Sequence, residues 1–450
     1  MSSRSTNFKV IIIGGGPIGL SAAHALHLAG IDFVVLERRL EIFEDKGASL
    51  VVHPHTLRVL YQFGILDNLL PRGAELNHHL SFTADGHVFA EGNRYGLIRE
   101  YHGHSPVVFH RAELLEIMYN GLPEAAKGKI LTGKKLTGLK TTRGGATATC
   151  ADGSIFHGSM IIGADGVYSK TRQIMRDLAL EEDANRSWDP VYPYTAAYQL
   201  LFGSFPSPSP AGQGYDIQSK GKAIMYFSGL ERGWFFLYKR LPRPTSKRTR
   251  YTQKDVDAVA AEFAEFPLTR TVKVKDVWTR MLGAGLTNLD EGIVKHWRFG
   301  RIVLVGDACH KMTTHLGLGF NHGIQDIVVL CNSLRKAVRA ASGIGGPSAQ
   351  VLTRIFEKYQ SVRMSSVCSL EGDVTKSGLE TRMHAWHNPC YYLLSRYLTV
   401  PHAIEVLFMK YVMASEFRKG QVLDYVPGEE RMKGKISWVY PMSPTLKTDY

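Results

Sequence analysis

The feature that most constrains the fold is a glycine-rich turn near the N-terminus, within KVIIIGGGPIGLSAAHALHLAGIDFVVLERR. We predict an apolar strand over Val10–Ile13, a helix after the glycines, and a second strand over Phe33–Leu36. In this setting Gly14 permits a tight turn, Gly16 lets the backbone approach a pyrophosphate, and Gly19 lets the helix and strand pack closely. The order of strand, glycines, helix and strand therefore predicts a dinucleotide-binding βαβ unit.

The residue that ends the second predicted strand is acidic. Glu37 is expected to accept hydrogen bonds from the ribose hydroxyls of an adenosine. The N-terminus of the helix would face the phosphates, because its free N–H groups and its dipole stabilise negative charge. NAD and FAD share this pattern, so the N-terminal segment alone does not choose between them.

The length and charge of the chain narrow the class of protein. With 450 residues, the chain exceeds one ordinary domain of about 100–200 residues, so we expect two or three structural units. The formal net charge is +13, but the basic residues are scattered apart from one short cluster at 239–250, which has no interleaved aromatic residues. We therefore predict no nucleic-acid partner, and we assign the charge to anionic cofactors or a membrane surface.

The cysteines and the chain ends indicate a reducing compartment. The five cysteines are an odd number and form no Cys-x-x-Cys pair, which argues against a disulfide framework. The opening MSSRSTNFK lacks the apolar segment of a secretory signal, so we predict a cytoplasmic protein. Residues 383–417 are apolar and aromatic, but Arg396, Glu405 and Lys410 interrupt them before the ~18 residues that a spanning helix needs. We expect packed helices in this C-terminal region, and a peripheral membrane contact through it stays open.

Two further strands end in an aspartate beside a glycine. The first segment, SMIIGADGVYSKTRQIM, contains Asp165, with Ser169 as a plausible helix cap. The second, GRIVLVGDACHKMTTHLGLGFNHGIQD, contains Asp307 and, close to it, His310, a pair that suggests hydrolysis or a metal. The sequence contains no serine nucleophile motif and no second histidine at metal-ligand spacing on a regular element. We therefore predict no metal site and interpret His310 as a positioned polar residue.

Together these segments resemble the signatures of single-component flavin hydroxylases, the p-hydroxybenzoate-hydroxylase-like flavoprotein monooxygenases. The closest resemblance is to their fungal secondary-metabolite branch, the paxilline-type FAD-dependent monooxygenases and epoxidases, and it extends from about residue 8 to about residue 335. It implies an α/β fold with a doubly wound Rossmann-like FAD domain, an interleaved β-sheet substrate domain and a helical C-terminal region. The implied boundaries are 1–80, 105–175 and 281–340 for the FAD domain, 81–104 and 176–280 for the substrate domain, and 341–450 for the C-terminal region.

The resemblance also implies which residues contact a non-covalently bound FAD. Asp165 belongs to a motif that serves both FAD and the reducing NADPH or NADH, whereas Asp307 would bind the flavin ribityl chain. Arg111, at the head of an amphipathic helix, matches an arginine that reaches FAD, and Val51 and Phe320 fall where relatives usually have glycine and alanine. The full set of predicted FAD-contacting residues is Gly14, Gly16, Gly19, Glu37, Val51, Arg111, Asp165, Asp307, Gly317, Gly319 and Phe320.

The substrate region departs from the family pattern. Relatives usually carry Tyr-Arg before a Phe-Gly pair, and Gln199 stands here in place of the arginine, which keeps a hydrogen-bond donor but no fixed charge. Tyr215 is the nearest match to a tyrosine expected on the next strand, and Thr314 replaces a proline beside the flavin. Gln199 and Tyr215 are the candidate catalytic residues, although a strand-surface glutamine without a chemical role is an equal alternative.

The resemblance implies an FAD-dependent monooxygenase that uses NADPH or NADH and O2. It would epoxidise or hydroxylate a small lipophilic substrate, a terpenoid or meroterpenoid natural-product intermediate, through a C4a-hydroperoxyflavin. One alternative is a redox-neutral cyclase or isomerase that retains bound FAD, motivated by Gln199 and Thr314. The other is a non-enzymatic prenyl-lipid carrier, against which the intact motifs of Asp165 and Asp307 count.

Overall fold

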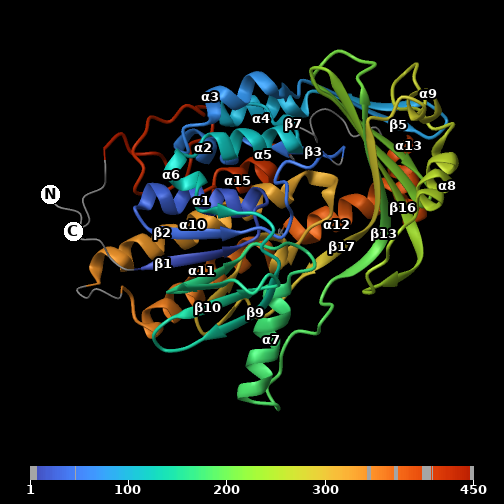
Figure 1. The fold of residues 1–450 in the computed structure, drawn as a ribbon. Coiled ribbons are helices and arrows are strands. Elements are labelled where there is room, and N and C mark those ends of the chain that lie inside the picture. The colour runs from blue at the N-terminus through green and yellow to red at the C-terminus, as the bar shows by residue number, and fades with distance from the viewer. Residues whose placement is uncertain are drawn as a thin grey trace.

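The computed structural model describes residues 8–45, 47–341, 346–368, 373–397, 407 and 409–445. Two large sheets dominate it, and one contains the predicted βαβ unit (Figure 1). In the order β18-β19-β12-β1-β2-β8, this six-stranded sheet is parallel except for its edge strand β18. Its strands are β1 (Lys9–Ile13), β2 (Asp32–Leu36), β8 (Ile130–Leu131), β12 (Met160–Gly163), β18 (Arg298–Phe299) and β19 (Ile302–Leu304).

Helices cover the six-stranded sheet. Helix α1 (Pro17–Ala29) follows β1 and packs against the long helix α10 (Leu318–Ala340). Gly30 ends α1 in the left-handed conformation, with φ of 68°, which a residue with a side chain rarely adopts. Residues 10–13 of β1 are all buried, and this continuous apolar run suits a parallel sheet whose two faces are both covered.

The second large sheet has eight strands, in the order β20-β17-β13-β16-β15-β14-β5-β6, and is antiparallel except between β14 and β5. Helices α8 (Gln253–Phe263) and α9 (Val274–Trp278) pack on one face, and α12 (Asp373–His384) packs against β14, β15 and β17 (Figure 1). The strands are β5 (His78–Thr83), β6 (Val88–Gly92), β13 (Thr195–Pro206), β14 (Gln213–Ser219), β15 (Lys222–Ser228), β16 (Arg232–Thr245), β17 (Gly283–Ile293) and β20 (His310–Lys311).

A small sheet of β3 (Ser49–Val52), β7 (Val107–His110) and β4 (Ala74–Glu75) contributes to both cores. Val52 and Val107 belong to the core of the six-stranded sheet, whereas Val108 packs with the eight-stranded one. The remaining elements used below are α2 (Pro54–Gln62), α3 (Leu66–Leu69), α4 (Arg94–His102), α5 (Arg111–Asn120), α7 (Lys170–Glu182), β9 (Leu136–Thr141), β10 (Ala146–Cys150) and β11 (Ile155–Gly158).

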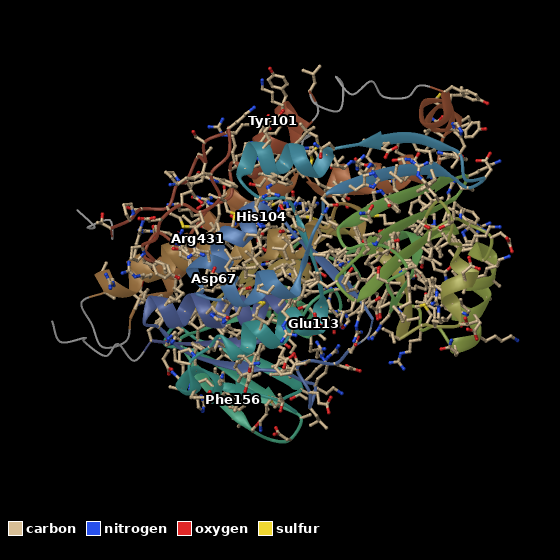
Figure 2. The ribbon with its side chains drawn as sticks, turned by 90° about the horizontal axis from the view of Figure 1, so that it is seen from above. Asp67, Tyr101, His104, Glu113, Phe156 and Arg431 are labelled. Atoms are coloured by element: carbon tan, nitrogen blue, oxygen red, sulfur yellow. The ribbon has the colours of Figure 1, made fainter. Side chains whose placement is uncertain are left out.

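The C-terminal region contains α11 (Ala349–Cys368), α12, α13 (Pro389–Tyr397), a π-helical turn (Met409–Met413) and α15 (Ala414–Phe417). The chain then returns over the helices of the N-terminal half, where Arg431 pairs with Asp67 of α3 at 2.6 Å (Figure 2). None of the helices in the described residues combines the length and apolar character needed to cross a membrane. Residues 1–7, 398–406 and 408 lie outside the described residues, so the predictions for the N-terminus and for 383–417 are addressed only in part.

Candidate functional site

A cavity of about 1180 Å³ is lined by residues of both large sheets and of the segments between them. Its volume exceeds the roughly 300–1,000 Å³ of an ordinary ligand pocket, so it has room for a large cofactor and a second molecule. One part is lined by residues of the predicted nucleotide motifs, namely Gly14, Gly16, Glu37, Arg111, Asp165, Asp307, Gly317 and Gly319. Another part is an apolar wall from the eight-stranded sheet, formed by Leu200, Phe202, Met225, Phe227 and Phe236.

The three glycines of the first turn are required for three different reasons. Gly14 has φ of 107°, and a Cβ there would lie 2.6 Å from the carbonyl oxygen of Ala164. A Cβ on Gly19 would lie 1.8 Å from the carbonyl oxygen of Gly14, so Gly19 allows the close packing of the helix on the turn. Gly19 does not line the cavity. A Cβ on Gly16 would meet no atom within 4 Å. Gly16 therefore leaves the N-terminus of α1 open to the cavity, as a bound pyrophosphate requires.

Charged side chains surround this open turn. Glu37 is buried and accepts hydrogen bonds from the backbone N–H groups of Gly15 (2.7 Å) and Arg39 (2.9 Å). Arg111 begins α5 and lines the cavity, and burial together with the nearby charge of Arg39 lowers its pKa. Such an environment favours an anionic ligand. Lys134 and Lys135 also line the cavity, although they belong to no sequence motif that would identify them as cavity residues.

Asp165 has a buried carboxylate oxygen that is suited to bind a ligand. Its Oδ2 accepts hydrogen bonds from the backbone N–H and the hydroxyl of Thr171, at 2.9 and 3.0 Å. Its Oδ1 is buried and has no partner among the described residues. Because an unpaired buried carboxylate oxygen is costly, this atom is suited to accept a hydrogen bond from a ligand in the cavity. The predicted cap is also present, since Ser169 Oγ accepts from Arg172 N–H at 2.9 Å.

Arg172 joins the two aspartate motifs. Its guanidinium donates to the carbonyl oxygens of Ala308 (2.8 Å) and Val167 (2.7 Å). The same group lies over the ring of Tyr194, whose hydroxyl donates to the carbonyl oxygen of Asp307 at 3.1 Å. Arg172 therefore acts within the protein, fixing the turn that carries Asp307 relative to the start of α7.

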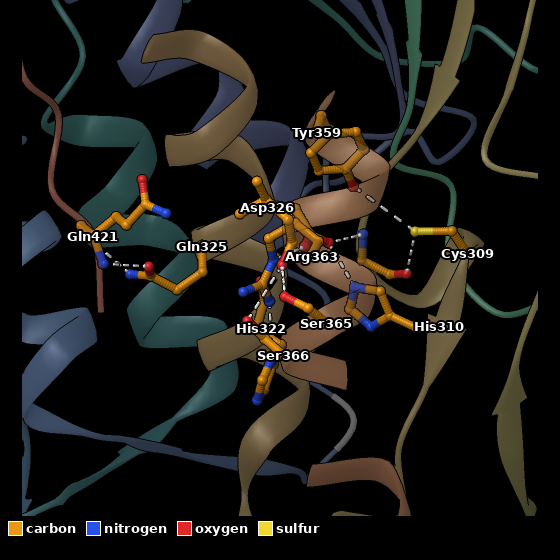
Figure 3. Close-up of polar contacts among 12 residues, drawn as sticks. Cys309, His310, His322, Gln325, Asp326, Tyr359, Arg363, Ser365, Ser366 and Gln421 are labelled. Atoms are coloured by element: carbon orange, nitrogen blue, oxygen red, sulfur yellow. Dashed lines mark hydrogen bonds and ion pairs between the residues drawn. The ribbon is translucent and has the colours of Figure 1, made fainter. Parts of the chain in front are cut away.

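A buried hydrogen-bond network supports the turn at Gly306-Asp307, and Figure 3 shows its members His310, Asp326 and Arg363. Gly306 adopts φ of 59° and its N–H donates to Asp326 Oδ2 at 2.8 Å. The same carboxylate lies 2.7 Å from His310 Nε2 and accepts from Arg363 Nε at 2.7 Å. Burial raises the pKa of Asp326, but His310 and Arg363 outweigh it and hold the pKa well below its usual value. His310 is thus a positioning residue behind the turn, and it does not line the cavity.

The glycine turn at Gly317 lies on the cavity side of the same segment. Gly317 adopts φ of 65°, and a Cβ there would lie 3.0 Å from Val51 Cβ. Asn321 Nδ2 donates to the carbonyl oxygens of Val51 (2.8 Å) and Gly317 (2.7 Å), so β3 and the turn are joined by one side chain. Val51, Gly319 and Phe320 all line the cavity, where the side chains of Val51 and Phe320 narrow the space beside the turn.

The two candidate catalytic residues do not line this cavity, although Tyr215 lines a small side cavity beside it, and their catalytic roles stay predictions. On β13, Leu200 and Phe202 line the cavity, and Gln199 points to the opposite face because successive strand residues alternate. Tyr215 donates to Gln213 Oε1 at 2.6 Å and packs against Phe82. An irregularity between Ala196 and Tyr198 shifts the register of β13 shortly before Gln199.

Two groups of donor side chains are close enough to hold a metal ion. They are Cys309, His310 and Asp326, and His315, Glu380 and His384, and within each group the donor atoms lie within 4.8 Å of one another. In the first group His310 and Asp326 already pair, and in the second His384 lies between the carboxylates of Asp216 and Glu380. These pairings engage His310, Asp326, Glu380 and His384, whereas His315 Nδ1 has no hydrogen-bond partner among the described residues.

Comparison with known proteins agrees with this geometry. The sequence profile of the FAD binding domain matches residues 7–344. The chain belongs to this family. The orphaned oxygen of Asp165 and the open N-terminus of α1 fit a dinucleotide cofactor of this kind. FAD, predicted from the glycine and aspartate motifs, is therefore the cofactor that these residues hold.

A relative from Penicillium shearii, the FAD-dependent monooxygenase esdpE, is 32% identical over 433 residues, which cover 93% of this chain and 86% of the relative. Among solved structures, an HpxO variant from Klebsiella pneumoniae complexed with FAD covers 90% of this chain and 99% of its own, with a TM-score of 0.69 and 22% identity. The Diels-Alderase PyrE3 of pyrroindomycin biosynthesis covers 90% and 80%, with a TM-score of 0.63 and 19% identity. The prediction of an α/β FAD-dependent monooxygenase resembling fungal enzymes is confirmed.

Proposed function

We propose that the protein uses NADPH or NADH and O2 to epoxidise or hydroxylate a lipophilic terpenoid or meroterpenoid intermediate of a secondary-metabolite pathway. The observation that carries this proposal is one cavity in which the FAD motifs adjoin an apolar wall of Leu200, Phe202, Met225, Phe227 and Phe236. An apolar wall binds a lipophilic molecule by removing its surface from water.

The residues that line the cavity have different proposed roles. Gly14, Gly16, Glu37, Arg111, Asp165, Asp307, Gly317 and Gly319 would hold FAD non-covalently, and Val51 and Phe320 would pack beside it. FAD, once bound and reduced, supplies the activation of O2. The chain contributes orientation and exclusion of water, since the apolar wall leaves few protein groups that retain water near the substrate.

The test is turnover with 18O2, NADPH and a panel of polycyclic terpenoids. We expect incorporation of one labelled oxygen atom into the product and NADPH consumption that depends on the terpenoid. A product of unchanged mass, formed equally well without NADPH and without O2, would contradict the proposal. Omitting O2 and NADPH in separate controls distinguishes uncoupled oxidation from oxygen transfer.

A redox-neutral reaction is the second candidate, favoured by the likeness to PyrE3, which is named a Diels-Alderase and shares the fold. The cavity also departs from the family at Thr314, whose hydroxyl hydrogen-bonds Tyr238 at 2.9 Å and lines the cavity. This alternative predicts that reduction of FAD leaves the rate of product formation unchanged. The rate with reduced and oxidised FAD under anaerobic conditions measures this directly.

We further propose peripheral contact with an anionic membrane through the C-terminal region. The exposed large apolar or aromatic side chains there include Leu393, Tyr397, Leu407 and Tyr411, and the chain carries a formal charge of +13. Co-sedimentation with vesicles of phosphatidylserine and phosphatidylcholine should retain the protein, and Tyr397→Ser with Tyr411→Ser should weaken retention. Equal retention of both proteins would count against this contact.

A further inference from the structure

Five ionisable side chains meet beside the apolar part of the cavity. We call them the histidine–carboxylate cluster: His79 of β5, Asp216 of β14, His315 of the turn at 314–316, and Glu380 and His384 of α12. All five line a side cavity of about 40 Å³, and two of them, His315 and Glu380, also line the main cavity. This volume accommodates ordered water, which needs roughly 10–15 Å³. The cluster therefore forms a polar boundary of an otherwise apolar chamber.

Within the cluster, His384 is clamped between two carboxylates. Its Nε2 lies 3.3 Å from Asp216 Oδ2, and its Nδ1 lies 3.1 Å from Glu380 Oε2. Asp216 is further fixed by His79 Nε2, 2.6 Å from its Oδ1. Because each nitrogen of His384 faces an acceptor, both nitrogens carry hydrogen and the ring is positively charged. Burial lowers the pKa of His384, but Asp216 and Glu380 outweigh burial and raise it to about 10.

His315 differs from His384 in its protonation state. Only 6% of the residue is exposed, and its Nδ1 is buried without a hydrogen-bond partner among the described residues. Its ring centroid lies 4.3 Å from that of His384. Burial, and then the positive charge of His384, lower the pKa of His315 to about 3. His315 therefore stays neutral, and its ring offers one donor and one acceptor nitrogen.

The position of His315 is fixed by its neighbours in the chain. The hydroxyl groups of Thr314 and Tyr238 hydrogen-bond at 2.9 Å, and the carbonyl oxygen of Leu316 lies 3.1 Å from His53 Nε2. Gly317, at the cofactor turn, follows two residues after His315. His315 therefore precedes the turn that is predicted to contact the flavin, and it lines the same cavity as the apolar wall.

We propose that His315 hydrogen-bonds a hydroxyl group of an otherwise lipophilic substrate, and that His384, held by Asp216 and Glu380, is the residue that positions the His315 ring. This inference rests on the proposed function in one respect, that the apolar part of the cavity takes the substrate. A site with a buried polar group discriminates against an analogue that lacks the matching hydroxyl, because that group is then left unpaired. The cluster would therefore select lipophilic alcohols over hydrocarbons of the same shape.

The experiment measures binding of two matched probes, 2-decalol and decalin, to the FAD-loaded protein by calorimetric titration. We expect the wild-type protein to bind the alcohol about fivefold or more tightly than the hydrocarbon, as one net hydrogen bond allows. His315→Leu should remove this preference, and His315→Gln, which keeps polar atoms, should retain part of it. Tyr226→Phe is the matched control, because it removes a buried hydroxyl from the same sheet at a residue that lines neither cavity and does not contact His315.

The outcomes separate this inference from the proposed function. A His315→Leu variant that keeps the full preference overturns the inference, as does a wild-type protein that binds both probes equally or binds neither. Binding is measured without turnover, so a failure of oxygen transfer in the 18O2 experiment would sink the proposed function while leaving an observed alcohol preference in place.

The positioning role of His384 is tested by the pH profile of the preference. Asp216 and Glu380 face His384, and the other ionisable groups that line the same side cavity, besides His315, are His79, Arg94, Tyr95 and Tyr215. In the wild-type protein we expect a constant preference from about pH 5.5 to about pH 8.5. His384→Gln removes the positive charge and leaves both carboxylates acting on His315, so the preference should become pH-dependent. Glu380→Gln, at a partly exposed residue, serves if the first variant does not fold, and a flat profile in the folded variant overturns the positioning role.

Discussion

The nucleotide end and the substrate end of the cavity are built in opposite ways. At the nucleotide end, contacts within the sequence motifs join residues of neighbouring elements, such as Gly15 with Glu37 and Asp165 with Thr171, and a few longer-range bonds such as that of Asn321 to Val51 join the motifs to one another. At the substrate end, the histidine–carboxylate cluster brings together residues from four separate elements between β5 and α12. Local motifs fix a cofactor that many relatives share, whereas a cluster assembled by the tertiary fold can change with one distant substitution. Variants that act locally at one end should therefore leave the other intact.

The largest effect is expected from Gly19→Ala. The new Cβ would lie 1.8 Å from the carbonyl oxygen of Gly14, a clash with backbone that a side-chain rotation cannot relieve. We expect a loss of about 4 kcal/mol or more in the free energy of unfolding, together with loss of FAD. Thermal unfolding and the flavin content of the purified protein measure both quantities.

The matched control is Gly16→Ala in the same turn. Its Cβ would meet no protein atom within 4 Å, so the apoprotein should keep its unfolding temperature while the methyl group obstructs the cofactor. Equal stability loss in both variants would mean that the two glycines have the same structural role, contrary to the distinction drawn here.

The second effect concerns the substrate end. Removing one partner from a buried ion pair typically costs about 3–5 kcal/mol, so His384→Gln should destabilise the protein strongly near neutral pH. The pKa of His384 is raised from 6.5 to about 10 on folding. Its stabilising contribution is therefore complete below about pH 6.5 and is lost as the pH rises towards 10. Denaturant unfolding should show a difference between wild type and variant that narrows over this range, and a constant difference would contradict the charged state.

Sequence reasoning succeeded where function depends on neighbouring residues. The strand, glycine turn and helix around Gly14 follow from local conformational rules, and Arg111 begins a helix as expected. Sequence reasoning could not place the side chain of Gln199, because an irregularity in β13 sets which face each residue occupies, and the catalytic role of Gln199 stays a prediction. It also overlooked His315. One signal was present, since Glu380 and His384 are four residues apart on α12 and so share a helix face, but the partner strand carrying Asp216 follows only from the tertiary fold.

The third effect returns to the nucleotide end at Asp165. In Asp165→Asn the amide oxygen can still accept a hydrogen bond from Thr171. The amide NH₂ group, which can only donate, then replaces the buried Oδ1 atom, which can only accept. We expect FAD affinity to fall by a factor equivalent to about 1–3 kcal/mol, with little change in the unfolding of the apoprotein. Fluorescence titration of FAD measures the change, and Asp177→Asn, at an exposed acid of α7, the helix that follows Asp165, is the control. Unchanged affinity would remove Asp165 from the cofactor site.

The smallest effect separates structure from binding within a single motif. Ser169 lies four residues after Asp165, but its hydroxyl caps α7 by accepting from Arg172 N–H at 2.9 Å, and it does not line the cavity. Ser169→Ala should therefore cost about 1 kcal/mol in unfolding, as loss of a helix cap usually does. Ser169→Thr, which keeps a capping hydroxyl, should restore most of this stability. FAD affinity should stay near the wild-type value in both variants, because the Oδ1 atom that awaits the cofactor belongs to Asp165. Loss of FAD from Ser169→Ala without loss of stability would instead place the Ser169 hydroxyl on the cofactor.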